Sequence, residues 1–263
     1  MERRFILQKD SDAQPEVDII KSVVQQYDIS QMNILQSLSH KVFKEYLNSS
    51  KNFTNVIPIG TIPFINSWLE KYHNKTMFAM EIPRCLWHSR FLNRTYGIVP
   101  KSGLPKFNRY FVKNLNHLKS GTFVGDMVKW WSSYSYDYED TDFFVLSSEL
   151  DILSEWRVYV IRQELVNMCH YDGDPLTFPN TTIIQQAINI CNEDKYVPNS
   201  YTLDVAVTTS GTCLLEVHPF TSVGLYTTLW DERLLDAYED GINFYVNNNS
   251  WWSTTQNNGG IEL

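Results

Sequence analysis

Two acidic side chains lie on the arms of a predicted β-hairpin and could hold a metal ion. Asp204 stands in residues 201–208 and Glu216 in residues 212–217, and both arms are otherwise almost wholly apolar, with a turn at residues 209–211. Pairing of the arms would bring the two carboxylates together, where they repel each other unless a cation lies between them. One or two carboxylates also hold Mg²⁺ at nucleotide phosphates. Caps at the strand ends, or a pair with an arginine, are equally open interpretations.

An arginine within an apolar strand is a second candidate. Residues 155–162 alternate so that Glu155, Arg157 and Tyr159 share one face of a predicted strand. An arginine there could bind phosphate or a substrate carboxylate through two parallel hydrogen bonds. Taken alone, the pattern favours the simpler interpretation of a salt bridge with Glu155 or with an acid on another strand.

A third cluster combines lysines with a glycine-containing loop. The predicted strand at residues 109–113 ends in Lys113, and Lys119 precedes Gly121 in the loop that follows. A lysine at a strand end can reach phosphates, and backbone N–H groups of such a loop can bind them. The sequence contains neither a P-loop nor a Gly-x-Gly-x-x-Gly motif. Taken alone, Lys113 is more typical of a solvated strand end.

The elements that position these residues fall into two parts. Up to residue 106 strands and helices alternate, which predicts an open α/β lobe with a partly parallel sheet. The helical spacing of Leu35, Leu38 and Val42 makes the helix at residues 33–46 the clearest of this lobe. The expected elements are strands at residues 3–8, 55–61 and 77–81, and helices at residues 16–27, 33–46 and 66–72.

The second part is rich in strands. Pro100, Gly103 and Pro105 mark residues 100–106 as the boundary between the lobes. We therefore expect an N-terminal lobe at residues 1–106, a strand-rich body at residues 107–246 and a loosely ordered tail at residues 247–263. The body is expected to contain strands at residues 109–113, 143–147, 155–162, 165–171, 201–208 and 212–217, and helices at residues 126–133, 183–191 and 231–246.

Composition narrows the class of partner. The chain has 263 residues, of which 43% are hydrophobic, and a formal net charge of −8. This acidic balance argues against an extended nucleic-acid surface, so a polyanion would need a few cations gathered at one place. The N-terminus lacks the pattern of a signal peptide, and no apolar stretch is long enough to span a bilayer. Four widely spaced cysteines predict free thiols in a reducing cytoplasm.

The order of the three clusters resembles that of the ATP-grasp superfamily, and in particular its phage and bacterial clade characterised by one arginine and two lysines. The similarity covers about residues 59–245 and is strongest from Glu155 to Tyr226. It implies an ATP-grasp fold of mixed α/β class, with a small N-terminal lobe and an ATP-binding body. The motifs that carry it are Lys113, Lys119, Glu155-Trp156-Arg157, Tyr171, Asp204, Glu216-Val217-His218 and Gly224-Leu225-Tyr226.

The resemblance also implies a role for each of these residues. ATP would lie between two strand-rich layers, with residues 147–150 along the adenine. Lys113 would contact the phosphates, and Lys119 would lie on the loop that covers them and act in catalysis. Arg157, also catalytic, would stabilise the transferring phosphoryl group or the acyl phosphate. Further cofactor contacts would come from Ser148, Glu149, Leu150 and Glu155, and the metal ligands would be Asp204, Glu216 and His218.

His218 departs from the pattern of the resembled family, which usually carries asparagine at this position. A neutral imidazole is a poor ligand for Mg²⁺ and a better one for Mn²⁺ or Zn²⁺. The expected cofactors are therefore ATP and Mg²⁺, with Mn²⁺ as an alternative metal.

The function implied by the resemblance is that of an ATP-dependent carboxylate–amine ligase, which forms an amide through an acyl phosphate and releases ADP and phosphate. The alternatives are a phosphotransferase on the same fold and a non-catalytic protein that binds a nucleotide or a host factor. The acceptor would be a small molecule, a peptide or a protein. The expected location is the cytoplasm, or the host cytoplasm if an asparagine- and isoleucine-rich composition reflects a phage genome.

Overall fold

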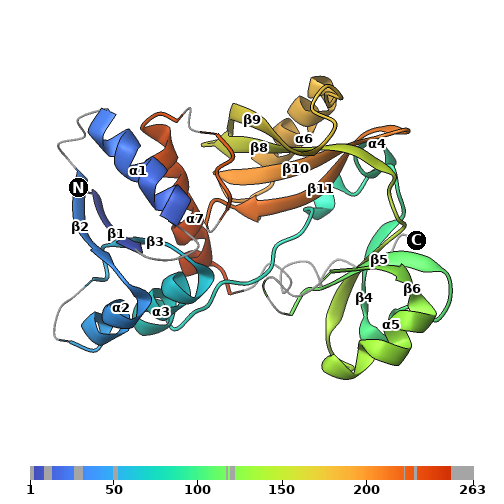
Figure 1. The fold of residues 1–263 in the computed structure, drawn as a ribbon, viewed down its shortest axis with the longest axis horizontal. Helices are drawn as coiled ribbons and strands as arrows, with labels where there is room; N and C mark the ends of the chain where they lie inside the picture. Colours follow the sequence, from blue (N-terminus) through green and yellow to red (C-terminus); the bar gives the residue numbers. More distant parts are fainter. Residues whose placement is uncertain are drawn as a thin grey trace.

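The computed structural model describes residues 3–8, 14–26, 32–49, 53–116, 118, 122–221, 223–227 and 230–249. Lys119 and residues 250–263 lie outside the described residues. The predicted role of Lys119 and the prediction of a loosely ordered tail beyond residue 249 therefore fall outside them as well. The described chain forms three sheets, which Figure 1 shows as three separate layers with helices packed around them.

The first sheet is parallel, as expected of an α/β lobe. Its strands β1 (Arg3–Gln8), β2 (Met32–Leu38) and β3 (Ile57–Ile59) lie in the order β2-β1-β3. Helices α1 (Gln14–Gln26), α2 (His40–Leu47) and α3 (Ile62–His73) connect and flank them (Figure 1). Phe5 and Leu7 of β1 belong to the core with α1, whereas Ile6 belongs to the core with α2 and α3. This alternation buries both faces of the sheet.

The expectation of a helix at residues 33–46 is wrong. Residues 32–38 form β2, which pairs in parallel with β1, and the helix begins only at His40. Ser39 is its N-cap, with Oγ accepting a hydrogen bond from the backbone N–H of Val42. The apolar spacing fits a helix, but pairing with β1 prevails over local periodicity. Ser39, a typical N-cap residue inside the predicted helix, is the signal that marks the true start.

The second sheet is antiparallel and has the order β4-β7-β5-β6. Its strands are β4 (Tyr96–Pro100), β5 (Arg109–Asn114), β6 (Thr122–Asp126) and β7 (Phe143–Ser147), of which β4 and β6 are absent from the expected elements. Helix α5 (Met127–Ser133) packs on it through Met127 and Trp130. Two short 3₁₀ helices complete this region, η2 (Lys101–Gly103) and η3 (Ser135–Asp137). A third, η1 (Arg84–Leu86), contacts the helix at residues 181–193. Because β4 precedes residue 106 and yet joins this sheet, the division into lobes stays a prediction.

The third sheet carries the hairpin with the two acids. Strands β8 (Ile152–Ile161), β9 (Glu164–Gly173), β10 (Tyr201–Thr208) and β11 (Gly211–Pro219) form an antiparallel sheet in the order β11-β10-β8-β9. Helix α6 (Thr181–Glu193) buries Ile184, Ala187 and Ile188 in the same core as this sheet, and α4 (Ser89–Leu92) contacts β11. Helix α7 (Arg233–Asn247) shares a core with β1 and β8 and so connects the first sheet to the third.

Residues 77–81, predicted as a strand, belong to no sheet in the described structure. Figure 1 shows this stretch crossing from α3 toward η1 without helical or strand structure. The local sequence favours a strand, but no neighbouring strand of the described chain lies where it could pair.

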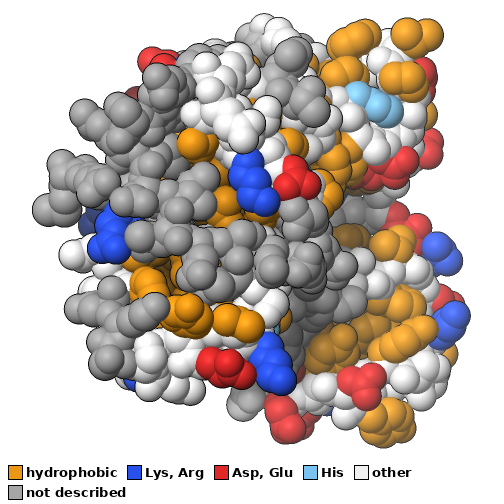
Figure 2. All heavy atoms as spheres, turned by 60° about the vertical axis from the view of Figure 1, so that its left-hand side comes forward, with side chains coloured by type: hydrophobic (Ala, Val, Ile, Leu, Met, Phe, Trp, Pro, Cys, Tyr) orange, Lys and Arg blue, Asp and Glu red, His pale blue; other side chains and the backbone are white. Residues whose placement is uncertain are grey.

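The described surface and thiols agree with the composition. No helix of the described chain is both long and apolar enough to cross a bilayer. On the face in Figure 2, described lysine and arginine side chains lie apart from one another with acids among them. All four cysteines are outside disulfides.

Candidate functional site

Arg157, Asp204 and Glu216 form a row across three neighbouring strands. In the register of the third sheet, Arg157 of β8 lies opposite Asp204 of β10, which lies opposite Glu216 of β11. Neighbouring strands are roughly 4.8 Å apart, and directly opposed side chains share a face. The predicted proximity of Asp204 and Glu216 is confirmed, and we call these three residues the ionic row.

A one-residue bulge brings Asp204 and Glu216 into register. Asp204 pairs with Glu216 and Val205 with Leu214, so Leu215 is an extra residue in β11. Without this bulge, the register near the turn would place Leu215 opposite Asp204 and Glu216 on the other face of the sheet. The bulge is therefore what places two carboxylates side by side.

Arg157 and Asp204 form a two-pronged ion pair. Arg157 donates from Nε and from a terminal nitrogen to the two carboxylate oxygens of Asp204, both at 2.7 Å. Its other terminal nitrogen donates to the carbonyl of Gly224 at 3.3 Å. The rings of Tyr171 and Tyr226 lie 5.6 and 5.0 Å from the guanidinium carbon. Burial alone would lower the pKa of Arg157, but the hydrogen bonds and charge of Asp204 raise it above its ordinary value.

Lys113 lies between two acids from distant parts of the chain. Its Nζ is 2.6 Å from Glu81 and 2.7 Å from Glu216. Burial raises the pKa of Glu81, and the charge of Lys113 only partly opposes this. Burial also favours neutral Lys113, but the two carboxylates outweigh it and raise the pKa of the lysine.

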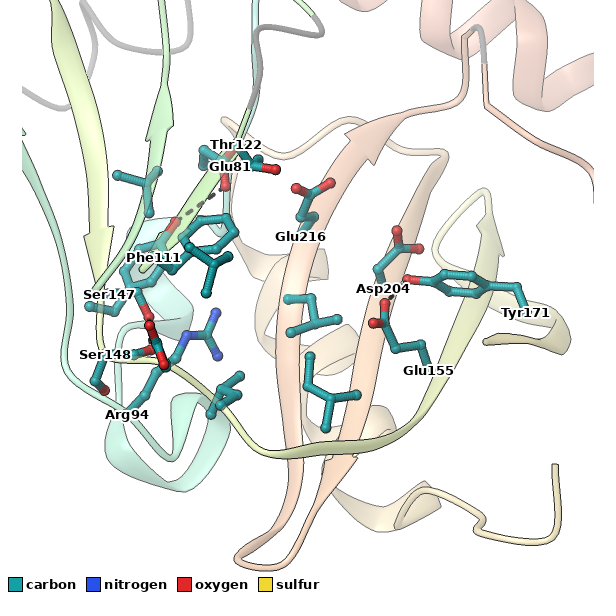
Figure 3. A pocket seen from close by; sticks show the side chains of 17 residues that line it. Glu81, Arg94, Phe111, Thr122, Ser147, Ser148, Glu155, Tyr171, Asp204 and Glu216 are labelled. Carbon is teal, nitrogen blue, oxygen red and sulfur yellow. Dashed lines mark hydrogen bonds between the residues drawn. The ribbon is translucent and has the colours of Figure 1, made fainter. Parts of the chain in front are cut away.

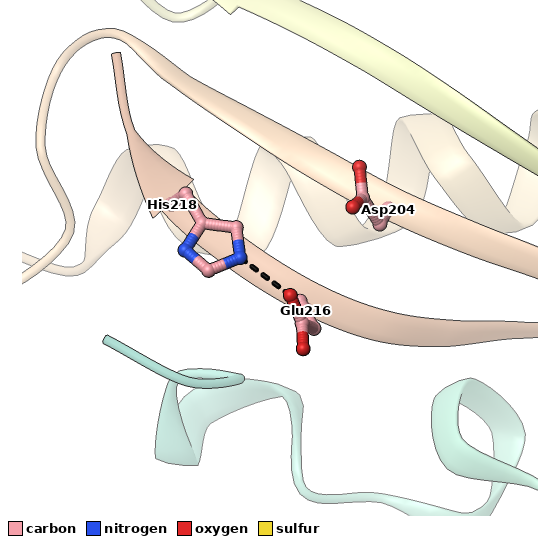
Figure 4. A group of neighbouring side chains, drawn as sticks. All are labelled: Asp204, Glu216 and His218. Carbon is pink, nitrogen blue, oxygen red and sulfur yellow. Dashed lines mark hydrogen bonds and ion pairs between the residues drawn. The ribbon is translucent and has the colours of Figure 1, made fainter. Parts of the chain in front are cut away.

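His218 completes a group that could hold a divalent cation (Figure 4). One ligand atom each from Asp204, Glu216 and His218 lies within 4.8 Å of the others. The Nε2 of His218 is hydrogen-bonded to Glu216 at 2.5 Å. Burial would raise the pKa of Glu216, but His218 and Lys113 outweigh it and hold that pKa well below its ordinary value. Two carboxylates and an imidazole fit a divalent cation.

A cavity of about 310 Å³ lies between the second and third sheets (Figure 3). Asp204, Glu216 and Glu155 line one side, and residues 147–150 line another. Arg94 points into it (Figure 3) and is held by the carbonyls of Leu92 and Leu214 at 3.0 and 2.7 Å. Burial lowers the pKa of Arg94. The apolar walls come from Phe111, Val145, Ile152 and Leu215.

A second cavity of about 390 Å³ adjoins the first. Glu216 lines both, while Lys113, Arg157 and His218 line only the second. The rest of its wall is mainly apolar and comes from residues 77–80, from the segment after β11 and from Tyr245. The charged groups thus lie where the two cavities meet.

The structure gathers most of the site residues named from the sequence. Lys113, Arg157, Asp204, Glu216 and His218 lie together, and Ser148, Glu149, Leu150 and Glu155 line the first cavity. Asp204 does pair with an arginine, which was the alternative interpretation. Glu149 forms an ion pair with Arg109 at 3.1 Å, and Glu155 accepts a hydrogen bond from Tyr171 at 2.5 Å. Burial raises the pKa of Glu155.

Sequence reasoning missed Glu81. It falls in a predicted strand without a role, yet its carboxylate is the second partner of Lys113 and lines the first cavity. The available signal was the same as for Asp204, a single acid inside an apolar run, here residues 77–82. An acid in such a run needs a partner when it is buried.

The three-dimensional fold is that of known ATP-grasp proteins. D-cycloserine synthetase DcsG matches with a TM-score of 0.53 at 9% identity, over 91% of this chain and 99% of that one. D-alanine–D-alanine ligase from Bacillus anthracis matches with a TM-score of 0.53 at 9% identity, over 94% and 99%. The ATP-grasp ligase PsnB, solved with a minimal precursor, matches with a TM-score of 0.51 at 9% identity, over 93% and 99%.

At such low identity these similarities show the fold alone. A search of curated proteins found no match to the sequence. A family model does match: it describes an ATP-grasp domain, family 2 of the clade of one arginine and two lysines, and covers residues 91–234. This match takes in more than half of the chain and includes β4 to β11. The mixed α/β fold, the sheets around the ionic row and this match agree: the chain belongs to the ATP-grasp superfamily, in family 2 of that clade.

Proposed function

We propose that this protein is an ATP- and Mg²⁺-dependent ligase that joins a carboxylate to an amine through an acyl phosphate. One observation carries the proposal: two cavities meet at Glu216, beside Lys113 and Arg157. A nucleotide in one cavity and a carboxylate in the other would face each other across these charges. The names of the similar structures, which include synthetases and ligases, are consistent with it.

The first cavity suits the nucleotide. Its apolar walls and the backbone of residues 147–150 would bind the adenine. Glu149 would leave its ion pair with Arg109 and accept hydrogen bonds from the ribose hydroxyls. Lys113 would turn from Glu81 and Glu216 toward the phosphates. Asp204, Glu216 and His218 would hold Mg²⁺, which when bound neutralises charge on the phosphate oxygens.

The reaction needs no protein nucleophile. A carboxylate oxygen of the first substrate forms a bond to the γ-phosphorus as the bond to the β–γ bridging oxygen breaks, and ADP leaves with that electron pair. The amine nitrogen then attacks the acyl carbon, the bond to phosphate breaks, and the nitrogen releases a proton to water. Arg157 and Lys113 bind the oxygens on which charge develops, so catalysis rests on positioning and charge.

Trapping of the acyl phosphate tests this function. The protein is incubated with ATP, Mg²⁺, hydroxylamine and a mixture of carboxylates, and both ADP and hydroxamate are measured. We expect both products, in equal amounts, and their loss in Asp204→Asn but not in Asp151→Asn, an exposed acid just before β8. A phosphoester with no hydroxamate would instead identify a phosphotransferase.

A further inference from the structure

Residues 77–80 form a wall of the second cavity and belong to no sheet. All four line it, with Met77 and Met80 buried at 7% and 1% exposure and Phe78 and Ala79 half-buried. The backbone N–H of Met77 donates to Asn66, and the carbonyl of Phe78 accepts a hydrogen bond from the hydroxyl of Tyr245. Within the described part of the chain, neither Ala79 nor Met80 forms a backbone hydrogen bond. Backbone N–H and C=O groups away from bulk water are nearly always paired in folded proteins. The N–H and C=O groups of Ala79 and Met80 are therefore open to water or to a bound molecule.

The cavity differs in character from end to end. Lys113, Arg157, Glu216 and His218 gather where it meets the first cavity, and the remaining wall is mainly apolar. The hydrogen bonds of Arg157 to Asp204 and Gly224 use three of the five N–H groups of its guanidinium. The other two are available to a carboxylate. The charged end thus fits a carboxylate, and the long apolar wall fits a chain that continues from it.

We propose that the carboxylate substrate is the free C-terminus of an extended peptide, which pairs its backbone with Ala79. This inference rests on the proposed function and names its substrate class. The terminal carboxylate lies at Arg157, and its oxygen takes the γ-phosphoryl group as ADP leaves. The preceding residues lie extended along residues 77–80, with hydrogen bonds between the two main chains. Their side chains pack against Phe78 and Val223.

A free amino acid fits this cavity less well. It would occupy only the charged end, so the backbone of Ala79 would stay unpaired and the apolar wall uncovered. The same proposal explains why the sequence of residues 77–81 favours a strand although no strand forms there. Its pairing partner would be the bound peptide.

Peptide length is the decisive variable. The full-length protein, ATP, Mg²⁺ and hydroxylamine are supplied with a mixture of free amino acids, or with libraries of dipeptides, tripeptides or C-terminally amidated tripeptides. We expect kcat/KM, measured by hydroxamate formation, to be at least about tenfold higher for tripeptides than for free amino acids. One or two additional hydrogen bonds to the substrate produce a difference of this size. The amidated library should give no product.

The backbone contact is tested from both sides. Methylation of the peptide nitrogens should lower kcat/KM about tenfold, and this measurement does not depend on a variant folding. Ala79→Pro, which removes the N–H, should lose the preference for tripeptides, whereas Ala79→Gly should keep it. Equal kcat/KM for amino acids and tripeptides, or no effect of methylation, overturns the inference and leaves the ligase standing. Absence of ADP with every carboxylate overturns both.

Discussion

Lys113 Nζ lies 2.6 Å from a carboxylate oxygen of Glu81, and the two residues come from different parts of the chain. Glu81 follows the wall at residues 77–80, whereas Lys113 is in β5 of the second sheet. Both side chains are almost fully buried, at 2% exposure for Glu81 and 12% for Lys113. This pair fixes the wall of the second cavity to the strand that carries the lysine.

Loss of Lys113 should destabilise the protein through the acid it leaves behind. Removing one partner of a buried ion pair costs about 3–5 kcal/mol, because the other charge stays buried. We expect Lys113→Met to lower the free energy of unfolding by about this amount, measured with urea. Lys129→Met, an exposed lysine of α5, should change it by less than about 0.5 kcal/mol.

The double replacement identifies the cause. Adding Glu81→Gln to Lys113→Met removes the uncompensated charge and should restore more than half of the lost stability. If the double variant is as unstable as the sum of the two single variants, the two side chains act independently and the ion pair is not the source.

Arg157→Lys should impair the chemical step more than nucleotide binding. Lysine keeps the charge but loses the planar pair of donors that Arg157 directs at Asp204. We expect the rate of ADP formation to fall about a hundredfold, with a change of only a few fold in the Kd for ATP measured by calorimetry. Arg233→Lys, in a comparable pair with Asp231 at the start of α7, should match the wild type in both. A loss confined to ATP binding would contradict the role given to Arg157.

Acid should weaken the fold partly through Glu216. Its pKa is lowered in the folded protein, where His218 and Lys113 outweigh burial, and returns to about its ordinary value of 4.5 on unfolding. Below that value the unfolded chain binds a proton that the folded chain does not, so stability falls as the pH drops. In urea unfolding between pH 6 and 3, Glu216→Gln should show a shallower decline than the wild type. Glu193→Gln, exposed in α6, should keep the wild-type slope.

His218 should set the preference among metals. An imidazole favours Mn²⁺ over Mg²⁺, whereas an amide oxygen does not. With a non-hydrolysable ATP analogue present, we expect His218→Asn to weaken Mn²⁺ binding more than Mg²⁺ binding, as measured by calorimetry. His88→Asn, an exposed histidine before α4, should leave both affinities unchanged. Equal losses for the two metals would show that His218 does not set the preference, and unchanged affinities for both would show that it is not a ligand.

Local pattern predicted the hairpin, and with it the meeting of Asp204 and Glu216, because one turn joins their strands. It left the partner of Asp204 open, because the answer lies in the register of β8 against β10, two strands that are far apart in sequence. Glu81 was harder still, since it lies in no sheet and its partner Lys113 lies 32 positions away in the second sheet. The prediction of a helix at residues 33–46 was wrong for a related reason. Residues 32–38 form a strand because they pair with β1, which is distant in sequence.

The bulge at Leu215 has a consequence for how related chains are compared. In a hairpin closed by a two-residue loop, as at Thr209 and Ser210, directly opposed residues are separated by an odd number of positions. Asp204 and Glu216 are 12 positions apart, an even number, and only the extra residue reconciles them. A relative with regular arms and the same loop would carry the same pair of acids 11 positions apart. Aligning such chains by a fixed interval between the acids would separate proteins that share one site.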